Sequence, residues 1–282
     1  MHAPLHFPRL PDWLVYAAVV FAFLVAALSR GERADAPPAP PPPSPGEGAV
    51  LDAESAFDDS LAVGAQPPGP NSAGTAFSVG EAGVWLSAGH VLDGCRQAAL
   101  VVAPGRGVVA KVAIDRQSDL AVLRTEGGAP PLPLALDARL RTGARGFHPG
   151  FPENRPGEAT SRLLGRQTLM IQSEGSRHSR PQSVLAWAEV GRTDGLTGLS
   201  GLSGAPVLDT QGRVVGLTIA EAPRRGRIYT ASPESVRGAL ARAGVVITPA
   251  LLGDPITVEN YGRMADALRR DLKVAQVMCL KR

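Results

Sequence analysis

The sequence is short of lysine and of aromatic residues, and both shortages limit what the protein can bind. Only three of its 29 basic residues are lysine, and no short stretch gathers lysine and arginine into a basic patch. Aromatic residues make up 5% of the chain, so few side chains could stack on bases. We therefore expect no nucleic acid as a partner. Nothing else in the composition requires a cofactor or a metal ion, and we expect neither.

Cysteine is also scarce, because the chain contains only Cys95 and Cys279. Two buried free thiols are the ordinary outcome in a reducing compartment, whereas an oxidising compartment favours a disulfide bond. The N-terminal segment described next can deliver the domain to an oxidising compartment, so we predict a bridge between the two cysteines. Closing a loop of about 180 residues would stabilise the folded state by roughly 5 kcal/mol in the simple chain-entropy model.

Long apolar runs are absent except at the N-terminus, where Trp13–Ser29 carries no charged residue. Seventeen residues of helix rise roughly 25 Å, at the lower limit for crossing a bilayer. The run exceeds the usual apolar core of a signal peptide, so we predict a transmembrane anchor over residues 1–30 in the inner membrane. A cleaved signal peptide is the alternative. The rest of the chain would then work in the periplasm, or be secreted if the segment is cleaved.

Residues 31–70 cannot build a core, because they include the stretch APPAPPPPSPGEG. Such proline-rich segments are extended and semi-rigid, which predicts a linker. From Asn71 onward the sequence changes to short, valine-rich apolar runs separated by Gly, Pro and Asp. No helical period is sustained in this first half of the globular region. The pattern predicts an all-β barrel or sandwich.

A glycine-rich loop over Gly198–Val207 contains two serines among three glycines and is followed by a short strand. Glycine tolerates positive φ, so such a loop can aim successive N–H groups into one concavity beside an exposed hydroxyl. Acyl transfer needs this combination of a nucleophile and donors for an oxyanion. His90 after one strand and Asp119 before another complete the order His, Asp, Ser, one of the known orders of a catalytic triad.

At this point the chain resembles a chymotrypsin-like serine protease, close in style to the bacterial HtrA/Deg-type branch. The resemblance covers roughly residues 71–244. It implies two Greek-key β-barrels of the chymotrypsin type with the active site between them, over residues 71–130 and 141–232 of a protease domain spanning residues 71–250. The matching stretches are Gly74–Phe77, Ser87–Val91, Ser118–Leu123, Gly201–Pro206, Gly212–Leu217 and Tyr229–Pro233.

The resemblance also implies a role for each residue of the site. Ser203 would be the nucleophile, His90 the general base, and Asp119 the group that orients the imidazole. Ser200 is a rival nucleophile, but only Ser203 is followed by Gly-Ala-Pro and a strand. The remaining assignments are the N–H groups of Gly201 and Ser203 for the oxyanion hole, Thr197 for the floor of the specificity pocket, and Val215, Gly216 and Leu217 for the substrate-binding strand.

Two departures from the family bear on specificity and activation. An uncharged Thr197 at the pocket floor disfavours basic residues and favours a small or apolar residue before the scissile bond. Trypsin-like zymogens carry an Asp where this chain has Leu202, so we expect no activation by a buried new N-terminus. HtrA/Deg proteins usually continue into a PDZ domain, but only about 38 residues follow Gly244, too few for one.

The remaining residues predict a helix over Ser232–Ala243, with Ser232 as the N-cap, and then a C-terminal helical tail over residues 251–282. Within this tail, Thr257–Lys273 is expected to be helical and Val274–Leu280 a short strand or extended end. His148 lies between Phe147 and Pro149, and with a complete triad elsewhere we expect it to be a structural turn residue.

The sequence thus predicts a membrane-tethered serine endopeptidase that acts on protein or peptide substrates. A protease-like scaffold or peptide-binding module without turnover is the alternative, although the intact His, Asp and Ser argue against it. An esterase with a Gly-x-Ser-x-Gly elbow would place Ser before His in a strand–helix alternation, and neither feature is present. The sequence gives no indication of the oligomeric state.

Overall fold

The computed structural model describes residues 11–29, 44–55, 57–64, 71–172, 180–247 and 253–281. The chain divides into two units, Met1–Pro42 and Pro43–Arg282. The first unit contains helix α1, Asp12–Ser29. Among the described residues no helix is both long and apolar enough to cross a membrane. The transmembrane anchor expected over residues 1–30 is therefore not confirmed.

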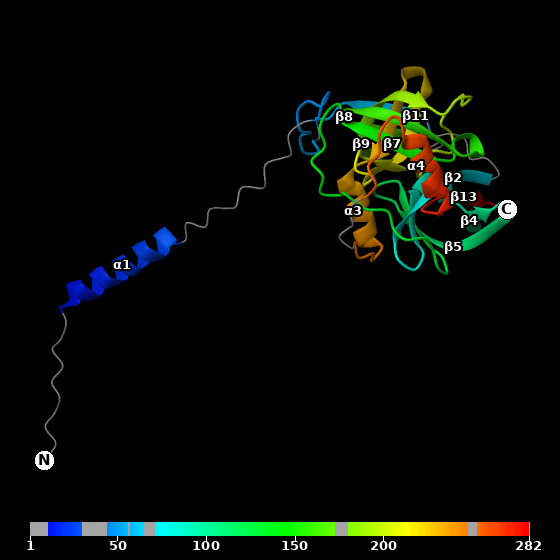
Figure 1. The fold of residues 1–282 in the computed structure, drawn as a ribbon. Coiled ribbons are helices and arrows are strands. Elements are labelled where there is room, and N and C mark those ends of the chain that lie inside the picture. Colours follow the sequence, from blue (N-terminus) through cyan, green and yellow to red (C-terminus); the bar gives the residue numbers. More distant parts are fainter. Residues whose placement is uncertain are drawn as a thin grey trace, which may run out of the picture. The chain divides into compact units, whose positions relative to one another are not determined.

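The second unit contains two closed antiparallel barrels (Figure 1). The first barrel has the strand order β13-β2-β3-β6-β5-β4. Its strands are short and rich in valine and alanine, and the short helix α2, Gly89–Leu92, follows β3. The strands are β2 Asn71–Gly80, β3 Val84–Ala88, β4 Gln97–Ala103, β5 Arg106–Asp115, β6 Leu120–Arg124 and β13 Val274–Leu280.

The C-terminal strand β13 closes the first barrel, which corrects the prediction that residues 71–130 complete it and that residues 251–282 form a separate helical tail. Gln276 pairs with Thr75 on β2 and with Val101 on β4. Figure 1 shows β13 beside β2 and β4. Near the end of β13, Cys279 is fully buried and joined to Cys95 by a disulfide bond with a Cα–Cα distance of 5.3 Å. The predicted cysteine pair is therefore present in the structure.

The second barrel belongs to a seven-stranded sheet of order β1-β8-β7-β10-β11-β12-β9, which closes because β8 also pairs with β9. Together with the first barrel it gives two barrels of six strands each, which confirms the predicted chymotrypsin-type fold. Strand β1 lies outside this ring and pairs in parallel with the C-terminal part of β8. The strands are β1 Ser60–Gly64, β7 Arg145–Gly150, β8 Gly157–Gln172, β9 Arg180–Arg192, β10 Pro206–Leu208, β11 Val214–Ala222 and β12 Arg227–Ala231. The 3-10 turns are η1 Pro152–Asn154 and η2 Pro223–Arg225.

Part of the predicted linker packs on this second barrel. Within residues 31–70, Val50 forms a β-bridge with Arg141 and Leu61 on β1 pairs with Leu169 on β8. The backbone of Leu51 also donates a hydrogen bond to the carbonyl of Leu140. The described residues of this region are therefore an arm of the protease unit, while residues 31–43 and 65–70 lie outside the described residues.

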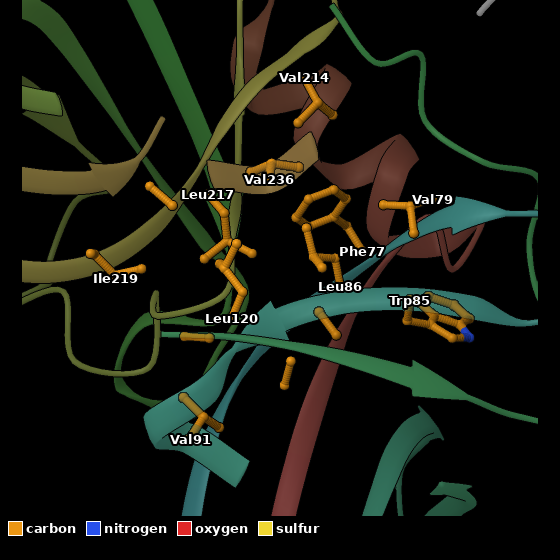
Figure 2. Packing of buried hydrophobic residues seen from close by; sticks show 14 of the residues in the cluster. Phe77, Val79, Trp85, Leu86, Val91, Leu120, Val214, Leu217, Ile219 and Val236 are labelled. Atoms are coloured by element: carbon orange, nitrogen blue, oxygen red, sulfur yellow. The ribbon is translucent and has the colours of Figure 1, made fainter. Parts of the chain in front are cut away.

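Helices α3 and α4 pack on the barrels, and the two barrels share one hydrophobic core. Helix α3, Pro233–Arg242, begins as predicted, because the hydroxyl of Ser232 accepts the backbone N–H of Ser235 at 3.2 Å. Helix α4, Tyr261–Arg270, packs on β7 through a contact of Tyr261 with Phe147, whose ring centroids lie 5.9 Å apart. Figure 2 shows Phe77 of β2 among side chains from both barrels and from α3. This continuous packing holds the two barrels together.

Candidate active site

His90 and Asp119 meet at the rim of the first barrel. His90 lies in α2, directly after β3, and Asp119 directly precedes β6, which pairs with β3. The backbone N–H of His90 donates to Oδ1 of Asp119 at 2.8 Å, and Nδ1 of the ring lies 2.7 Å from Oδ2. One carboxylate therefore binds both the backbone and the ring of the histidine. Because 46% of the His90 side chain stays exposed, its far nitrogen, Nε2, is available for chemistry.

This contact also sets the electrostatics of His90. Burial alone would lower its pKa, but the charge of Asp119 and the hydrogen bond to it outweigh that effect and raise the pKa above 6.5. With Nδ1 donating its hydrogen to the carboxylate, the neutral ring carries its lone pair on Nε2, the form required of a general base.

The backbone at Asp119 is held from several sides. Its φ of +47° is a left-handed conformation, and its carbonyl accepts the N–H of Gly89 at 2.8 Å. A Cβ on Gly89 would lie 2.9 Å from Oδ1 of Asp119, so glycine is needed there. From β9 of the other barrel, the buried Gln182 donates its side-chain N–H to the carbonyl of Ser118 at 2.7 Å. These contacts hold the peptide that precedes the carboxylate.

Ser203 follows a tight turn whose shape depends on glycine. The N–H of Leu202 donates to the carbonyl of Leu199 at 2.8 Å, and Gly201 within the turn has a φ of +94°. After the serine, Gly204 has a φ of +90°, and a Cβ there would lie 1.9 Å from the carbonyl oxygen of Thr75. The pattern Gly-x-Ser-Gly is therefore required by the backbone path and by its close approach to β2.

Strand β2 of the first barrel binds this turn and brings it towards His90. The N–H of Thr75 donates to the carbonyl of Ser203 at 2.8 Å, and its hydroxyl donates to the carbonyl of Gly201 at 2.9 Å. A Cβ placed on the neighbouring Gly74 would meet both the carbonyl oxygen of Ser203 at 2.8 Å and a methyl of Val91 at 2.9 Å. The segments that carry Ser203 and His90 thus pack against the same glycine.

Two backbone donors beside the hydroxyl are free. Within the described part of the chain, neither the N–H of Gly201 nor that of Ser203 donates a hydrogen bond. Such a pair of unused N–H groups next to a hydroxyl has the arrangement of an oxyanion hole. Ser200 is exposed, and its carbonyl is bound by the N–H of Glu153, so this rival serine takes part in the turn instead.

The residues predicted for the substrate-binding strand lie in the buried part of β11. Val215 and Leu217 are 1% and 0% exposed and belong to the core, and the intervening Gly216 is buried as well. The hydroxyl of Ser203 lies instead 3.5 Å from the carbonyl of Ile219. The strand pairing of β10 with β11 ends at Leu217, and Thr218 continues the contact through backbone hydrogen bonds with Ala205 and Gly204. Among the described residues, no backbone pairing is seen on this edge of β11 beyond Thr218, while the other edge pairs with β12.

Thr197, the predicted pocket floor, is bound by a carboxylate that sequence reasoning missed. Oε1 of Glu153 accepts the N–H of Thr197 at 2.8 Å and that of Gly198 at 3.0 Å, and it also accepts the Thr197 hydroxyl. These hydrogen bonds lower the pKa of Glu153 to about 2. Nothing in the sequence near Glu153 signals this contact, because the partner lies 44 residues away.

His148 has no part in this site. It lies in β7 rather than in a turn, its side chain is fully buried, and burial lowers its pKa to about 3. Its two ring nitrogens lie 3.0 Å from the hydroxyl of Thr218 and 2.7 Å from that of Ser161, and its ring meets Trp187 edge-on. The prediction of a structural role agrees with this environment, although the local conformation is a strand.

Two closed antiparallel barrels joined around a common core, with a His–Asp pair at the rim of the first barrel and a serine turn bound to its strand β2, define the chymotrypsin-type architecture. Comparison with known proteins agrees. The family model for the trypsin-like peptidase domain matches residues 74–217. HhoA of Synechocystis, which is named as a serine protease, is 26% identical over 184 residues, covering 62% of this chain and 45% of that protein.

Solved structures of another protein are similar to this fold. The active form of the protease Rv3671c from M. tuberculosis has a TM-score of 0.51 at 20% identity, covering 74% of this chain and 100% of that one. An inactive mutant form of the same protease has a TM-score of 0.50 at 22% identity, covering 61% of this chain and 81% of that one. At these identities the likeness concerns the fold alone.

The family match covers just over half of the chain, so the chain belongs to the trypsin-like peptidase domain family. The chain spans under half the length of HhoA.

Proposed function

We propose that the protein hydrolyses peptide bonds through a triad of His90, Asp119 and Ser203. The observation that carries this proposal is the double contact of Asp119 with the backbone and the Nδ1 atom of His90. This contact leaves Nε2 of His90 as the base. The segment that carries His90 and the turn that carries Ser203 both pack against Gly74. The serine would attack the carbonyl while His90 takes its proton. His90 would then return this proton to the amine as the peptide C–N bond breaks, and water, deprotonated by His90, would hydrolyse the resulting acyl-enzyme and release the acid and Ser203.

Charge that develops on the carbonyl oxygen would be stabilised by the N–H groups of Gly201 and Ser203. Thr75 supports this role, because its hydroxyl binds the carbonyl of Gly201 and so fixes the orientation of the turn. The extended substrate would lie along the edge of β11 beyond Thr218, where backbone groups can pair with a peptide strand. Protein or peptide substrates are the class that such an edge binds.

The identity of the nucleophile is tested by labelling with a fluorophosphonate probe, followed by peptide mapping. Ser203→Ala should abolish labelling and lower kcat by about 10⁶-fold if the triad acts as a unit. Ser200→Ala is the matched control and should keep a substantial fraction of activity. Labelling that survives Ser203→Ala but disappears in Ser200→Ala would overturn the assignment. An intact, folded protein that neither labels nor cleaves would instead favour a scaffold without turnover.

We also propose that the protease unit works outside the cytoplasm, because the bond between Cys95 and Cys279 is stable only in an oxidising compartment. Tethering to the inner membrane through Trp13–Ser29 is part of this proposal, and it rests on the apolar sequence of that segment. Carbonate extraction of membranes tests it: the full chain should stay in the pellet, while a chain beginning at Asn71 should not. Free thiols in protein isolated from the cell envelope would contradict the location.

A further inference from the structure

The connection that carries Asp119 has a demanding backbone. Strand β5 ends at Asp115 and β6 begins at Leu120, so residues 116–119 make the link between them. Its last residue, Asp119, has a φ of +47°, a left-handed conformation that is uncommon for a residue other than glycine. Such a conformation persists where the surrounding structure holds it. The contacts that hold this connection therefore decide where the Asp119 carboxylate lies.

Asp115 organises the connection from its beginning. Its Oδ1 accepts the backbone N–H of Gln117 at 3.3 Å, and its Oδ2 accepts the hydroxyl of Ser118. Ser118 is buried, and its carbonyl accepts the side-chain N–H of Gln182 at 2.7 Å. One carboxylate thus binds both of the residues that lead into Asp119.

Arg242, in the last turn of α3, holds this carboxylate from outside the connection. Its Nε donates to Oδ1 of Asp115 at 3.1 Å and its Nη2 to Oδ2 at 2.6 Å. The Asp115 side chain is only 11% exposed, whereas that of Arg242 is 42% exposed. Two parallel bonds from a planar guanidinium fix the orientation of a carboxylate as well as its distance, which a single point charge does not.

Helix α3 is itself fixed beside the connection. It packs on β6, and the carbonyl of Ala243 at its end accepts Nη2 of Arg124 on β6 at 2.9 Å. One turn before Arg242 the helix contains Gly238, where a Cβ would lie 3.0 Å from Nη1 of Arg242. Glycine inside a helix is less stable than alanine, but here it leaves room for the guanidinium.

We propose that Arg242 is a positioning residue for the triad. By holding Asp115, it fixes the connection that sets the Asp119 carboxylate against His90. Arg242 touches neither the substrate nor the reacting atoms, and it acts through Asp115 and the peptide that precedes Asp119. This inference rests on the proposed function.

The pKa of His90 provides a readout of this role. Burial lowers that pKa, and among the described residues it is Asp119 whose charge and hydrogen bond raise it above 6.5. A carboxylate that is held less firmly would stabilise the imidazolium less, so the pKa would fall. Loss of the Arg242 charge alone has the opposite sign, because removing a cation favours protonation. The direction of the shift therefore separates positioning from a long-range effect of charge.

The test measures how fast a small fluorophosphonate labels Ser203 as a function of pH. Arg242→Ala should lower the rate constant by about 10-fold, and the midpoint of its acid limb should move to lower pH. Arg242→Lys keeps the charge but cannot form both bonds, so it should recover only part of the rate. Arg237→Ala is the matched control, because it removes another ion pair of α3, with Asp137, and it should leave rate and midpoint unchanged.

A second variant tests the same contact from its other side. Asp115→Asn keeps an acceptor for Ser118 but has no charge, and it should lower the rate as Arg242→Ala does. The double variant should lose little more than either single one, because both act through one contact. These two single variants and Arg242→Lys also keep the comparison possible if one of them does not fold.

Three results would overturn the proposal. They are a wild-type rate and midpoint in a folded Arg242→Ala protein, an equal loss in Arg237→Ala, and fully additive losses in the double variant. A folded wild-type protein that the probe does not label would overturn the proposed function instead.

Discussion

His148 should make the folded protein sensitive to mild acid. Its imidazole is fully buried in β7 between the hydroxyls of Thr218 and Ser161, and burial lowers its pKa from 6.5 to about 3. In the unfolded chain the ring would bind a proton near pH 6.5. Between these two values the unfolded state binds more protons than the folded state, so stability is present above about pH 6.5 and is lost as the pH falls.

The size of this effect follows from the two pKa values. Their difference is 6.5 minus about 3, or about 3.5 units, and each unit corresponds to about 1.36 kcal/mol, which gives a total loss of about 5 kcal/mol at pH 3. At pH 5 the ring of the unfolded chain is almost fully protonated, and the loss is already about 2 kcal/mol. A domain whose total stability is about 5–15 kcal/mol would register such a change clearly.

Urea denaturation at pH 7 and pH 5 measures the effect in a Ser203→Ala background, which prevents self-cleavage. The comparison is between His148 and His148→Gln, which keeps polar atoms near both hydroxyls but does not titrate in this range. The change in unfolding free energy between the two pH values should be about 2 kcal/mol smaller in the variant. This difference stays meaningful even if the substitution lowers stability at both pH values.

His90→Gln is the control with the opposite sign. Asp119 raises the pKa of His90, so its contribution to stability is present below its unfolded pKa and is lost as the pH rises through its folded pKa. Removing it should cost more stability at pH 5 than at pH 7. Identical pH dependence in the wild type and His148→Gln would refute the argument, since it would mean that the buried ring does not change its protonation on unfolding.

Three further predictions concern the disulfide, the base and its support. Replacing Cys95 and Cys279 by serine should lower the free energy of unfolding by up to about 5 kcal/mol, since the bridge closes a loop with a sequence separation of 184 residues; urea titration and non-reducing peptide mapping check this. The acid limb of kcat/KM should have its midpoint above pH 6.5, because the pKa of His90 is raised, and a profile flat down to pH 5 would contradict a histidine base. Gln182→Leu should lower kcat by about 10-fold or more with little change in KM, because the peptide before Asp119 loses its hydrogen bond; an unchanged kcat in a folded variant would exclude the positioning role.

The residues that could be predicted from the sequence are those whose chemistry is local. Gly201 and Gly204 surround Ser203 because the turn requires positive φ at both positions, and this requirement is visible in the sequence itself. The N-cap at Ser232 is equally local. For the same reason the strands of the first half were recognisable from their short apolar runs and the turn residues between them.

The side chains that contact the predicted pocket floor could not be predicted in this way. Counting back from the nucleophile indicates Thr197, but the carboxylate that binds it belongs to Glu153, 44 residues earlier in the chain. Spacing along the chain carries no information about which distant side chain fills a pocket. The burial of Val215 and Leu217 in β11 could not be predicted either, because it depends on the packing of the strand against other elements.

The largest departure from expectation concerns β13, and it connects the end of the chain to the catalytic turn. A seven-residue apolar strand does not specify which sheet it joins, so only the cysteine in it suggested a place near Cys95. In the structure Gln276 pairs with Thr75, the residue whose backbone and side chain bind Ser203 and Gly201. Without β13, one edge of β2 would lose its partner, and Thr75 would lose the strand pairing with Gln276 that holds it in register. The last strand of the chain is therefore part of the support of the active site, and its disulfide fastens that support at the end of β13.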